Sequence, residues 1–181
     1  MKTILIFLFT TLVHFSIAQI QLTPNGFRDQ SDTSKMFSVI DLKNQSHRHL
    51  YQISLVRLQS PIPYCNKVSV KVSEDKAIIA EGESIPLFAI GMSKIYAKFT
   101  VAFMFKDGKM KYEVLRCDYD AEGAGGVRLN LKGEGKKNAL DQFIWSSGDI
   151  LIHPDAKRQT EFFFNNLLSE VLKAVQEWEK W

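Results

Sequence analysis

Residues 94–119, KIYAKFTVAFMFKDGKMKYEVLRCDY, decide the fold of this chain. Two runs of alternating apolar residues meet at Asp107-Gly108. An Asp-Gly pair between such runs is the strongest short-range signal for a β-hairpin, because a type I′ turn needs positive φ at both central residues. The stretch therefore predicts two long antiparallel strands joined by a two-residue turn.

The position of the turn predicts which residues of the two strands face each other. The pairs are Lys106 with Lys109, Phe105 with Met110, Phe103 with Tyr112, and Val101 with Val114. Successive side chains in a strand point to opposite faces, so the last three pairs share an apolar face with Ile95, Ala97 and Phe99. The other face is mixed: Tyr96, Lys98, Thr100, Ala102 and Met104 lie opposite Tyr119, Cys117, Leu115, Glu113 and Lys111. A two-stranded ribbon is not stable alone, so other elements must cover the apolar face.

The C-terminal residues 157–181 predict the main covering helix. Its apolar residues recur at steps of four and three: Phe164, Leu168, Val171, Val175 and Trp178. That spacing places them on one helical stripe, which typically packs against a sheet.

Shorter elements flank the hairpin. We predict strands at 36–42, 67–74 and 77–83, and a helix that begins after Ser46 and ends before Pro61. We expect residues 121–138 to be a glycine-rich surface loop that could contain a short strand at 127–131. We expect one or two helical turns at 138–145 and an apolar anchor at 150–152.

The first residues, MKTILIFLFTTLVHFSIAQ, have the pattern of a secretory signal peptide. Lys2 precedes an apolar run at 4–17, and a small-x-small site ends at Ala18. We expect cleavage after Ala18, a secreted or periplasmic location and no transmembrane segment in the mature chain. The expected organisation is a signal peptide at 1–18, a loosely held lead-in at 19–35 and a single α+β domain at 36–181.

Composition narrows the class of partner. The chain has 181 residues, of which 45% are hydrophobic and 12% aromatic, so it is globular rather than disordered. Its net charge is +3, which falls to +2 if Lys2 is removed with the signal peptide. So weak an excess argues against nucleic acid and anionic membrane surfaces as partners.

The two cysteines, Cys65 and Cys117, have two interpretations. Export would place them where disulfides form, and a bridge would close a loop of about 50 residues. Alternatively, each is a small buried apolar side chain.

The order of strand, helix, strand, short strand, long hairpin and C-terminal helix resembles a family of exported bacterial proteins. That family is a domain of unknown function with a TATA-binding-protein-like (TBP-like) fold. The likeness lies in Phe37-Ser38-Val39-Ile40, Leu50-Tyr51, the segment 75–82 and the hairpin core 103–114, and covers about residues 36–120. The resemblance implies a curved antiparallel sheet of five or six strands with two main helices on one face, and it implies no activity.

One acidic cluster is a candidate metal site. Asp118, Asp120 and Glu122 alternate before Gly123, as at positions one, three and five of a calcium loop. The twelfth position, which should be glutamate, is Leu129. The alternative interpretation is an acidic strand end in solvent. A metal-dependent hydrolase using this cluster is the alternative function.

The sequence does not match the other common motifs for phosphate binding, metal binding or nucleophilic catalysis. The glycine-rich loop lacks the G-x-x-x-x-G-K-[ST] pattern for phosphate. His47 and His49 are two apart at a helix start and so point to different faces, and His153 precedes a proline. There is no G-x-S-x-G elbow. We therefore expect no enzyme and no cofactor.

The mixed face of the hairpin is the remaining candidate for function. Its low-charge surface would carry the ligand-binding residues Tyr96, Lys98, Thr100, Lys111, Glu113 and Tyr119. The sequence favours a monomeric, non-catalytic binding or structural module of the cell envelope, with a protein, peptide or glycan as partner.

Overall fold

The computed structural model describes residues 19–74, 76–123, 128–133 and 141–178. In chain order the elements are β1 (Ile20–Thr23), β2 (Gly26–Asp29), β3 (Phe37–Asp41), α1 (His47–Gln59), β4 (Cys65–Ser73), β5 (Ala77–Ser84), β6 (Phe88–Ile90), β7 (Ser93–Lys106), β8 (Lys109–Glu122), β9 (Arg128–Lys132), β10 (Asp141–Trp145) and α2 (Pro154–Trp178). The predicted signal peptide lies outside the described residues.

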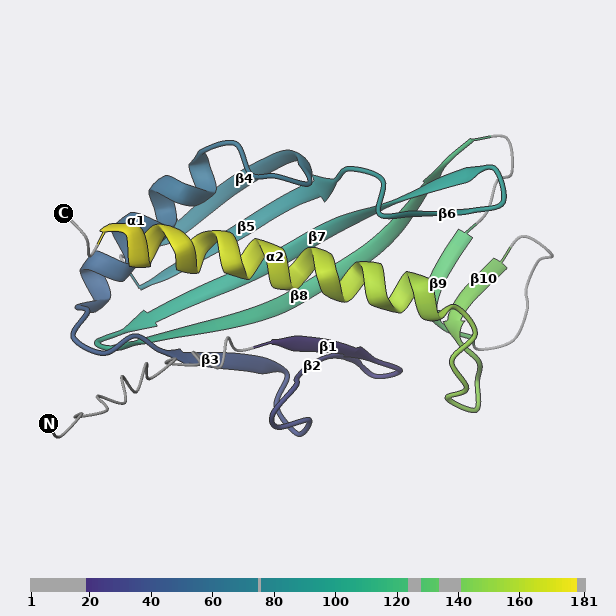
Figure 1. Cartoon of the computed structure of the whole chain (residues 1–181), viewed down its shortest axis with the longest axis horizontal. Coiled ribbons are helices and arrows are strands. Elements are labelled where there is room, and N and C mark those ends of the chain that lie inside the picture. The colour runs from purple at the N-terminus through teal and green to yellow at the C-terminus, as the bar shows by residue number, and fades with distance from the viewer. Residues whose placement is uncertain (1–18, 75, 124–127, 134–140, 179–181) are drawn as a thin grey trace, which may run out of the picture.

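The main sheet has six antiparallel strands in the order β3-β8-β7-β5-β4, and β6 also pairs with β7. Figure 1 shows α2 lying along the β7–β8 hairpin with α1 beside it. Both helices pack against the side chains of one sheet face. The predicted α+β class, strand number and placement of the helices are confirmed.

The turn of the hairpin keeps the predicted pairing but not the predicted turn type. Lys106 faces Lys109, and the three predicted apolar pairs also form. Gly108 has a φ of +70°, whereas Asp107 is not among the described residues with positive φ, so the turn is not type I′. Both turn residues are hydrogen-bonded to the start of α1 and the segment before it. Asp107 Oδ1 accepts a hydrogen bond from the His47 N–H at 2.7 Å, and the Gly108 N–H donates to the Gln45 carbonyl at 2.7 Å.

A β-bulge interrupts the hairpin midway. Val101 faces Val114, but the preceding residue, Thr100, faces Arg116, so Leu115 is the extra residue. The bulge exchanges the faces of all β8 residues that follow it. Cys117 then lies opposite Phe99 and Tyr119 opposite Ala97, on the helix side.

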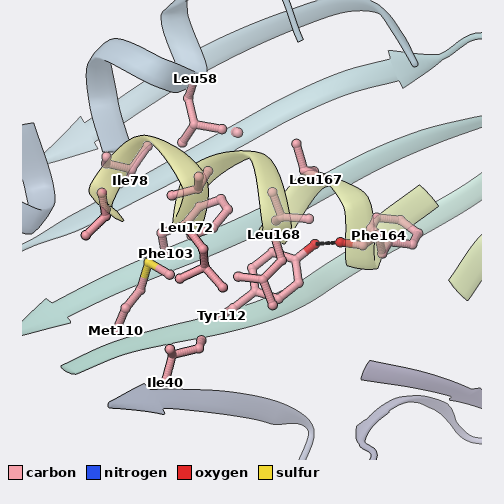
Figure 2. Packing of buried hydrophobic residues seen from close by; sticks show 14 of the residues in the cluster. Ile40, Leu58, Ile78, Phe103, Met110, Tyr112, Phe164, Leu167, Leu168 and Leu172 are labelled. Carbon is pink, nitrogen blue, oxygen red and sulfur yellow. Dashed lines mark hydrogen bonds between the residues drawn. The ribbon is translucent and has the colours of Figure 1, made fainter. Parts of the chain in front are cut away.

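The main core lies between the sheet and α2. Figure 2 shows Phe103, Met110 and Tyr112 of the hairpin packed against Leu168 and Leu172 of α2. The aliphatic and aromatic side chains of this cluster are almost fully buried, as the stripe in α2 predicts. Strand β5 and helix α1 extend the core through Ile78 and Leu58.

A second, smaller core covers the far end of the hairpin on the same side. It contains Ile95 of β7, Leu129 of β9 and both Ile144 and Trp145 of β10. Strand β10 pairs in parallel with β9, so the helical turns predicted at 138–145 are wrong for residues 141–145. A short apolar run does not distinguish helix from strand, and pairing with β9 decides for the strand. The predicted anchor at 150–152 is also wrong, because Ile150 is 70% exposed.

The segment expected to be a loose lead-in is instead packed against α2. Strands β1 and β2 form a hairpin whose Ile20 and Leu22 are 2% and 1% exposed. The Ile20 N–H donates to Asn165 Oδ1 at 2.9 Å and the Leu22 N–H to Glu161 Oε1 at 2.7 Å. These side chains satisfy the outer edge of β1, which explains why a short polar segment is held.

Each helix begins at a residue type that favours a helix N-terminus. Ser46 caps α1 by accepting the His49 N–H, as predicted. Helix α2 begins at Pro154, three residues before the predicted start, because proline is favoured at the first helical position. Its predicted last three residues lie outside the described part. Neither helix is long and apolar enough, within the described residues, to cross a membrane.

Candidate binding face

The face of the main sheet opposite the helices carries polar and charged side chains over most of its length and aliphatic ones, among them Ala77, Ile79 and Ala102, toward the hairpin turn; we call it the open face. Strand pairing places the following residues on it: Lys67, Ser69 and Lys71 of β4, Glu81 and Glu83 of β5, Tyr96, Lys98, Thr100 and Met104 of β7, and Lys111, Glu113, Arg116, Asp118, Asp120 and Glu122 of β8. The second core lies on the helix side of the sheet, so the described residues of β9 and β10 do not cover the open face.

Two rows of side chains cross the open face at its centre. The first row, read from β4 to β8, is Lys67, Glu83, Lys98 and Asp118, which alternate in charge. The second row is Ser69, Glu81, Thr100 and Arg116. These eight residues, with Gly82 and Phe99, line a depression of about 430 Å³. The depression therefore lies over the middle of four strands.

Gly82 is needed beneath this depression. A Cβ at this position would lie 2.5 Å from the Lys67 carbonyl oxygen and 2.7 Å from Cζ of Phe99. Real Cβ atoms do not approach other atoms so closely. The glycine thus lets β4 and β5 pair while Phe99 packs against Phe163 on the helix side.

Ion pairs neutralise most charges on the open face. Lys98 Nζ lies 2.7 Å from Asp120 Oδ2, and their hydrogen bond raises the pKa of Lys98 and lowers that of Asp120. Lys71 pairs with Glu81 at 2.9 Å, and Arg116 pairs with Asp118. The surface therefore has no strong excess of either sign.

A smaller depression adjoins the first one. Its volume is about 320 Å³, and its lining includes Asn66, Glu83, Tyr96, Asp120 and Glu122. The Tyr96 hydroxyl donates to Glu122 Oε2 at 2.5 Å, which raises the pKa of this half-buried tyrosine. Because Glu83 lines both depressions, they form one continuous polar surface.

The end of the open face near the turn is less polar. Met104 and Val39 are 41% and 46% exposed there. Lys111 lies 4.1 Å from the centre of the Phe37 ring and 2.8 Å from Glu113. The open face thus changes from charged to partly apolar along the strands.

The structure brings five of the six predicted ligand-binding residues together on the open face: Tyr96, Lys98, Thr100, Lys111 and Glu113. Tyr119 is the exception, and its prediction is wrong. Its hydroxyl lies 2.9 Å from Thr160 Oγ1 of α2, and burial raises its pKa well above the ordinary value. The bulge at Leu115 is the cause, because it turns Tyr119 toward the helices.

The same bulge places the predicted metal cluster on the open face. Asp118, Asp120 and Glu122 lie in strand β8 rather than in a loop, so the calcium-loop prediction is wrong in its geometry. Alternate residues in a strand are about 6.8 Å apart, which spreads the three carboxylates over about 14 Å. The part of the chain that the structure describes contains no group of three His, Cys, Asp or Glu that could hold a metal ion.

The two cysteines are not bridged in the structure. Cys65 lies in β4 and Cys117 in β8, with β5 and β7 between them. Three strand spacings amount to about 14 Å, whereas a disulfide needs Cα atoms within about 7 Å. Both side chains are half-buried, as the interpretation of small apolar residues expects. This burial raises the pKa of each thiol to about 12.

Sequence reasoning missed the contributions of Arg116, Glu81 and Glu83 to this face. A signal for Arg116 exists in the sequence. Apolar residues occupy even positions up to Val114 and odd positions from Cys117 onward, and a change of phase within a strand is typical of a bulge.

A six-stranded antiparallel sheet with two helices on one face is a TBP-like α+β fold, as the sequence resemblance implied. Two solved structures are similar to this chain. A DUF4468 family protein from Bacteroides ovatus matches with a TM-score of 0.51 and 13% identity, over 77% of this chain and 84% of that one. A TBP-like protein from Parabacteroides distasonis matches with a TM-score of 0.50 and 16% identity, over 77% and 90%. The sequence matches no family model and no curated protein. At these identities the similarity shows the fold alone.

Proposed function

We propose that this chain is an exported, non-catalytic binding or structural module of the cell envelope that uses the open face to engage a partner. The observation that carries the proposal is the placement of both helices on one side of the sheet. That placement leaves a broad polar face with a central depression, lined by side chains of three strands and the edge strand β4.

The chemistry of the open face supports binding rather than catalysis. Three of its acidic residues are engaged with neighbours: Asp120 with Lys98, Asp118 with Arg116 and Glu122 with Tyr96. A general base or a nucleophile instead needs a nearby group that activates it and a site that excludes water. Paired charges on an exposed face favour recognition of a polar surface.

The first eighteen residues support export. Their positive start, apolar run and small-x-small end are the features that a secretory signal peptide requires. We test export by fusing residues 1–18 to a reporter enzyme that is active only after secretion, with a fusion lacking residues 4–17 as control. Activity of the first fusion alone is the expected result, and equal inactivity of both would reject export.

The open face is tested by placing a photo-crosslinking amino acid at Thr100, in the centre of the depression, in cells that produce the protein. The matched control places the same amino acid at Lys173, on the solvent side of α2. We expect a discrete crosslinked product from Thr100, absent from Lys173, and reduced by the charge reversals Lys98→Glu and Arg116→Glu. Absence of any product from Thr100 would overturn the proposal.

A further inference from the structure

We propose that the partner of the open face is a second copy of this chain, docked face to face by a two-fold axis. The axis runs parallel to the strands and lies between β5 and β7. This inference rests on the proposed use of the open face. It follows from a symmetry in the positions of the charges on the paired strands β4, β5, β7 and β8.

The first row of the open face is complementary to itself under that axis. A rotation about an axis parallel to the strands reverses the order of the row, so β4 of one copy meets β8 of the other, and β5 meets β7. Lys67 then faces the second copy's Asp118, and Glu83 faces the second copy's Lys98. All four side chains of the row meet the opposite charge.

The next three rows toward the hairpin turn obey the same relation. Ser69 meets Arg116 and Glu81 meets Thr100, which pairs charged groups with hydroxyl groups. In the third row Lys71 meets Glu113 and Ile79 meets Ala102; in the fourth Ser73 meets Lys111 and Ala77 meets Met104. Across these four rows no like charges meet. Such agreement is the complementarity that gives an interface its specificity. Met104 is the exposed aliphatic side chain of these rows, whereas Ala102 is 2% exposed and adds almost no surface to the interface.

The existing ion pairs do not prevent docking. Lys98 uses one donor on Asp120, and an ammonium group has three, so it can also donate to Glu83 of the second copy. Asp118 has lone pairs for Lys67 of the second copy besides its contact with Arg116. The depression on each copy gives the long side chains of the other room to enter.

The size of the face matches a weak, reversible dimer. Four strands span about 19 Å, and the four rows span about 20–24 Å along them. These spans give about 380–460 Å² per partner, below the roughly 600 Å² at the lower end of stable specific interfaces, which is why the expected dimer is weak. A polyanion as partner is disfavoured, because acidic residues interrupt every cluster of basic ones.

The test measures the dimer by sedimentation of the exported chain between about 5 and about 500 µM at low salt. We expect a concentration-dependent dimer whose dissociation constant rises at least about tenfold in about 0.5 M salt, since salt screens exposed charges. Lys67→Glu or Asp118→Lys alone should weaken the dimer at least about tenfold, because each creates a like-charge contact across the interface.

The double variant K67E/D118K shows whether the change in the dissociation constant comes from contacts between the two copies or from contacts within one copy. Within one copy Lys67 and Asp118 are about 14 Å apart, across β5 and β7. The swap also places like charges beside Glu83 and Lys98, so effects within one copy predict an additive loss. Pairing between copies predicts recovery to within about threefold of the original dissociation constant. Lys173→Glu, on α2, serves as the control and should change nothing.

A second measurement does not depend on charge. The pair S69C/R116C should be joined between copies by a thiol-specific crosslinker that spans about 10 Å, the distance between packed sheets. S69C alone should be joined far less, because Ser69 meets Arg116 and not itself. A chain that is monomeric throughout, or a swap without recovery, overturns the inference. If Thr100 still crosslinks to another protein in that case, the proposed function stands and only the identity of the partner fails.

Discussion

The Tyr112 hydroxyl donates a hydrogen bond to the Phe164 carbonyl oxygen at 3.2 Å, in the fully buried space between β8 and α2. This bond joins the centre of the hairpin to the helix that covers it (Figure 2). It also satisfies the only polar atom of a tyrosine side chain that has no access to water. Burial accordingly raises the pKa of Tyr112 well above its ordinary value.

Tyr112→Phe should therefore lower the free energy of unfolding by about 0.5–1.5 kcal/mol without changing the fold. The ring remains packed against Phe103, and only the hydrogen bond is lost. Urea denaturation followed by circular dichroism measures the difference. Tyr64→Phe is the matched control, since Tyr64 is 46% exposed, and it should leave stability unchanged. An equal loss of unfolding free energy in both variants would contradict a stabilising role for the hydrogen bond from Tyr112.

Asp29 gives the protein a specific sensitivity to acid. It is 6% exposed and accepts hydrogen bonds from the side chains of Ser31 and Ser38, both at 2.5 Å. Burial raises its pKa, but these bonds and two backbone N–H donors outweigh burial, so the folded-state pKa lies below the ordinary 3.8. A lowered pKa stabilises the fold above the unfolded-state value, and that stability is lost as the pH falls through the folded-state value.

Asp29→Asn should then lower the free energy of unfolding near neutral pH by about 1–3 kcal/mol, because an amide replaces a carboxylate that only accepts. The free energy of unfolding of this variant should also fall less steeply between about pH 5 and about pH 3 than that of the unchanged chain. Urea unfolding at several pH values measures both effects. Parallel curves for the two proteins would show that Asp29 has no part in the acid response.

Gly82→Ala should destabilise the protein by about 1–3 kcal/mol, because the added methyl group meets the Lys67 carbonyl and the Phe99 ring. Gly148→Ala is the control. Its nearest surrounding atom would be 3.9 Å away, and its effect on the thermal midpoint should be small. If the two substitutions cost the same, close packing at Gly82 is not the reason for glycine there.

The thiols of Cys65 and Cys117 should be free and slow to react. Their pKa values of about 12 leave little thiolate at pH 8, so iodoacetamide should modify the native protein slowly and the urea-unfolded protein at both positions. Mass spectrometry counts the added groups. An unfolded, unreduced chain that takes up none would indicate a disulfide and contradict the separation of the two strands.

Local signals in the sequence predicted the elements that depend on neighbouring residues. The two-residue turn and strict alternation decide the pairing from Lys106–Lys109 to Val101–Val114. Ser46 and Pro61 bound α1 because one supplies a cap and the other disfavours helical geometry before it. The stripe of α2 predicts its buried face for the same reason, since helical periodicity is a local property.

Sequence reasoning failed where a distant partner decides the structure. Residues 141–145 are a strand because β9 supplies backbone hydrogen bonds, and β1 is held because Asn165 and Glu161 reach its edge. Neither contact has a signature within the segment itself. The candidate site was only partly predicted for the same reason, as Glu81 and Glu83 join it through the pairing of β5 with β7.

The sequence by itself thus determined the central hairpin near its turn, both helices and the apolar side that they cover, because turn chemistry and side-chain periodicity act over a few residues. The tertiary structure alone decided the strand order and hence which residues of β4 and β5 join the hairpin on the open face. Those features depend on pairings between strands far apart in the chain, where a shift of one residue exchanges the two faces of a sheet.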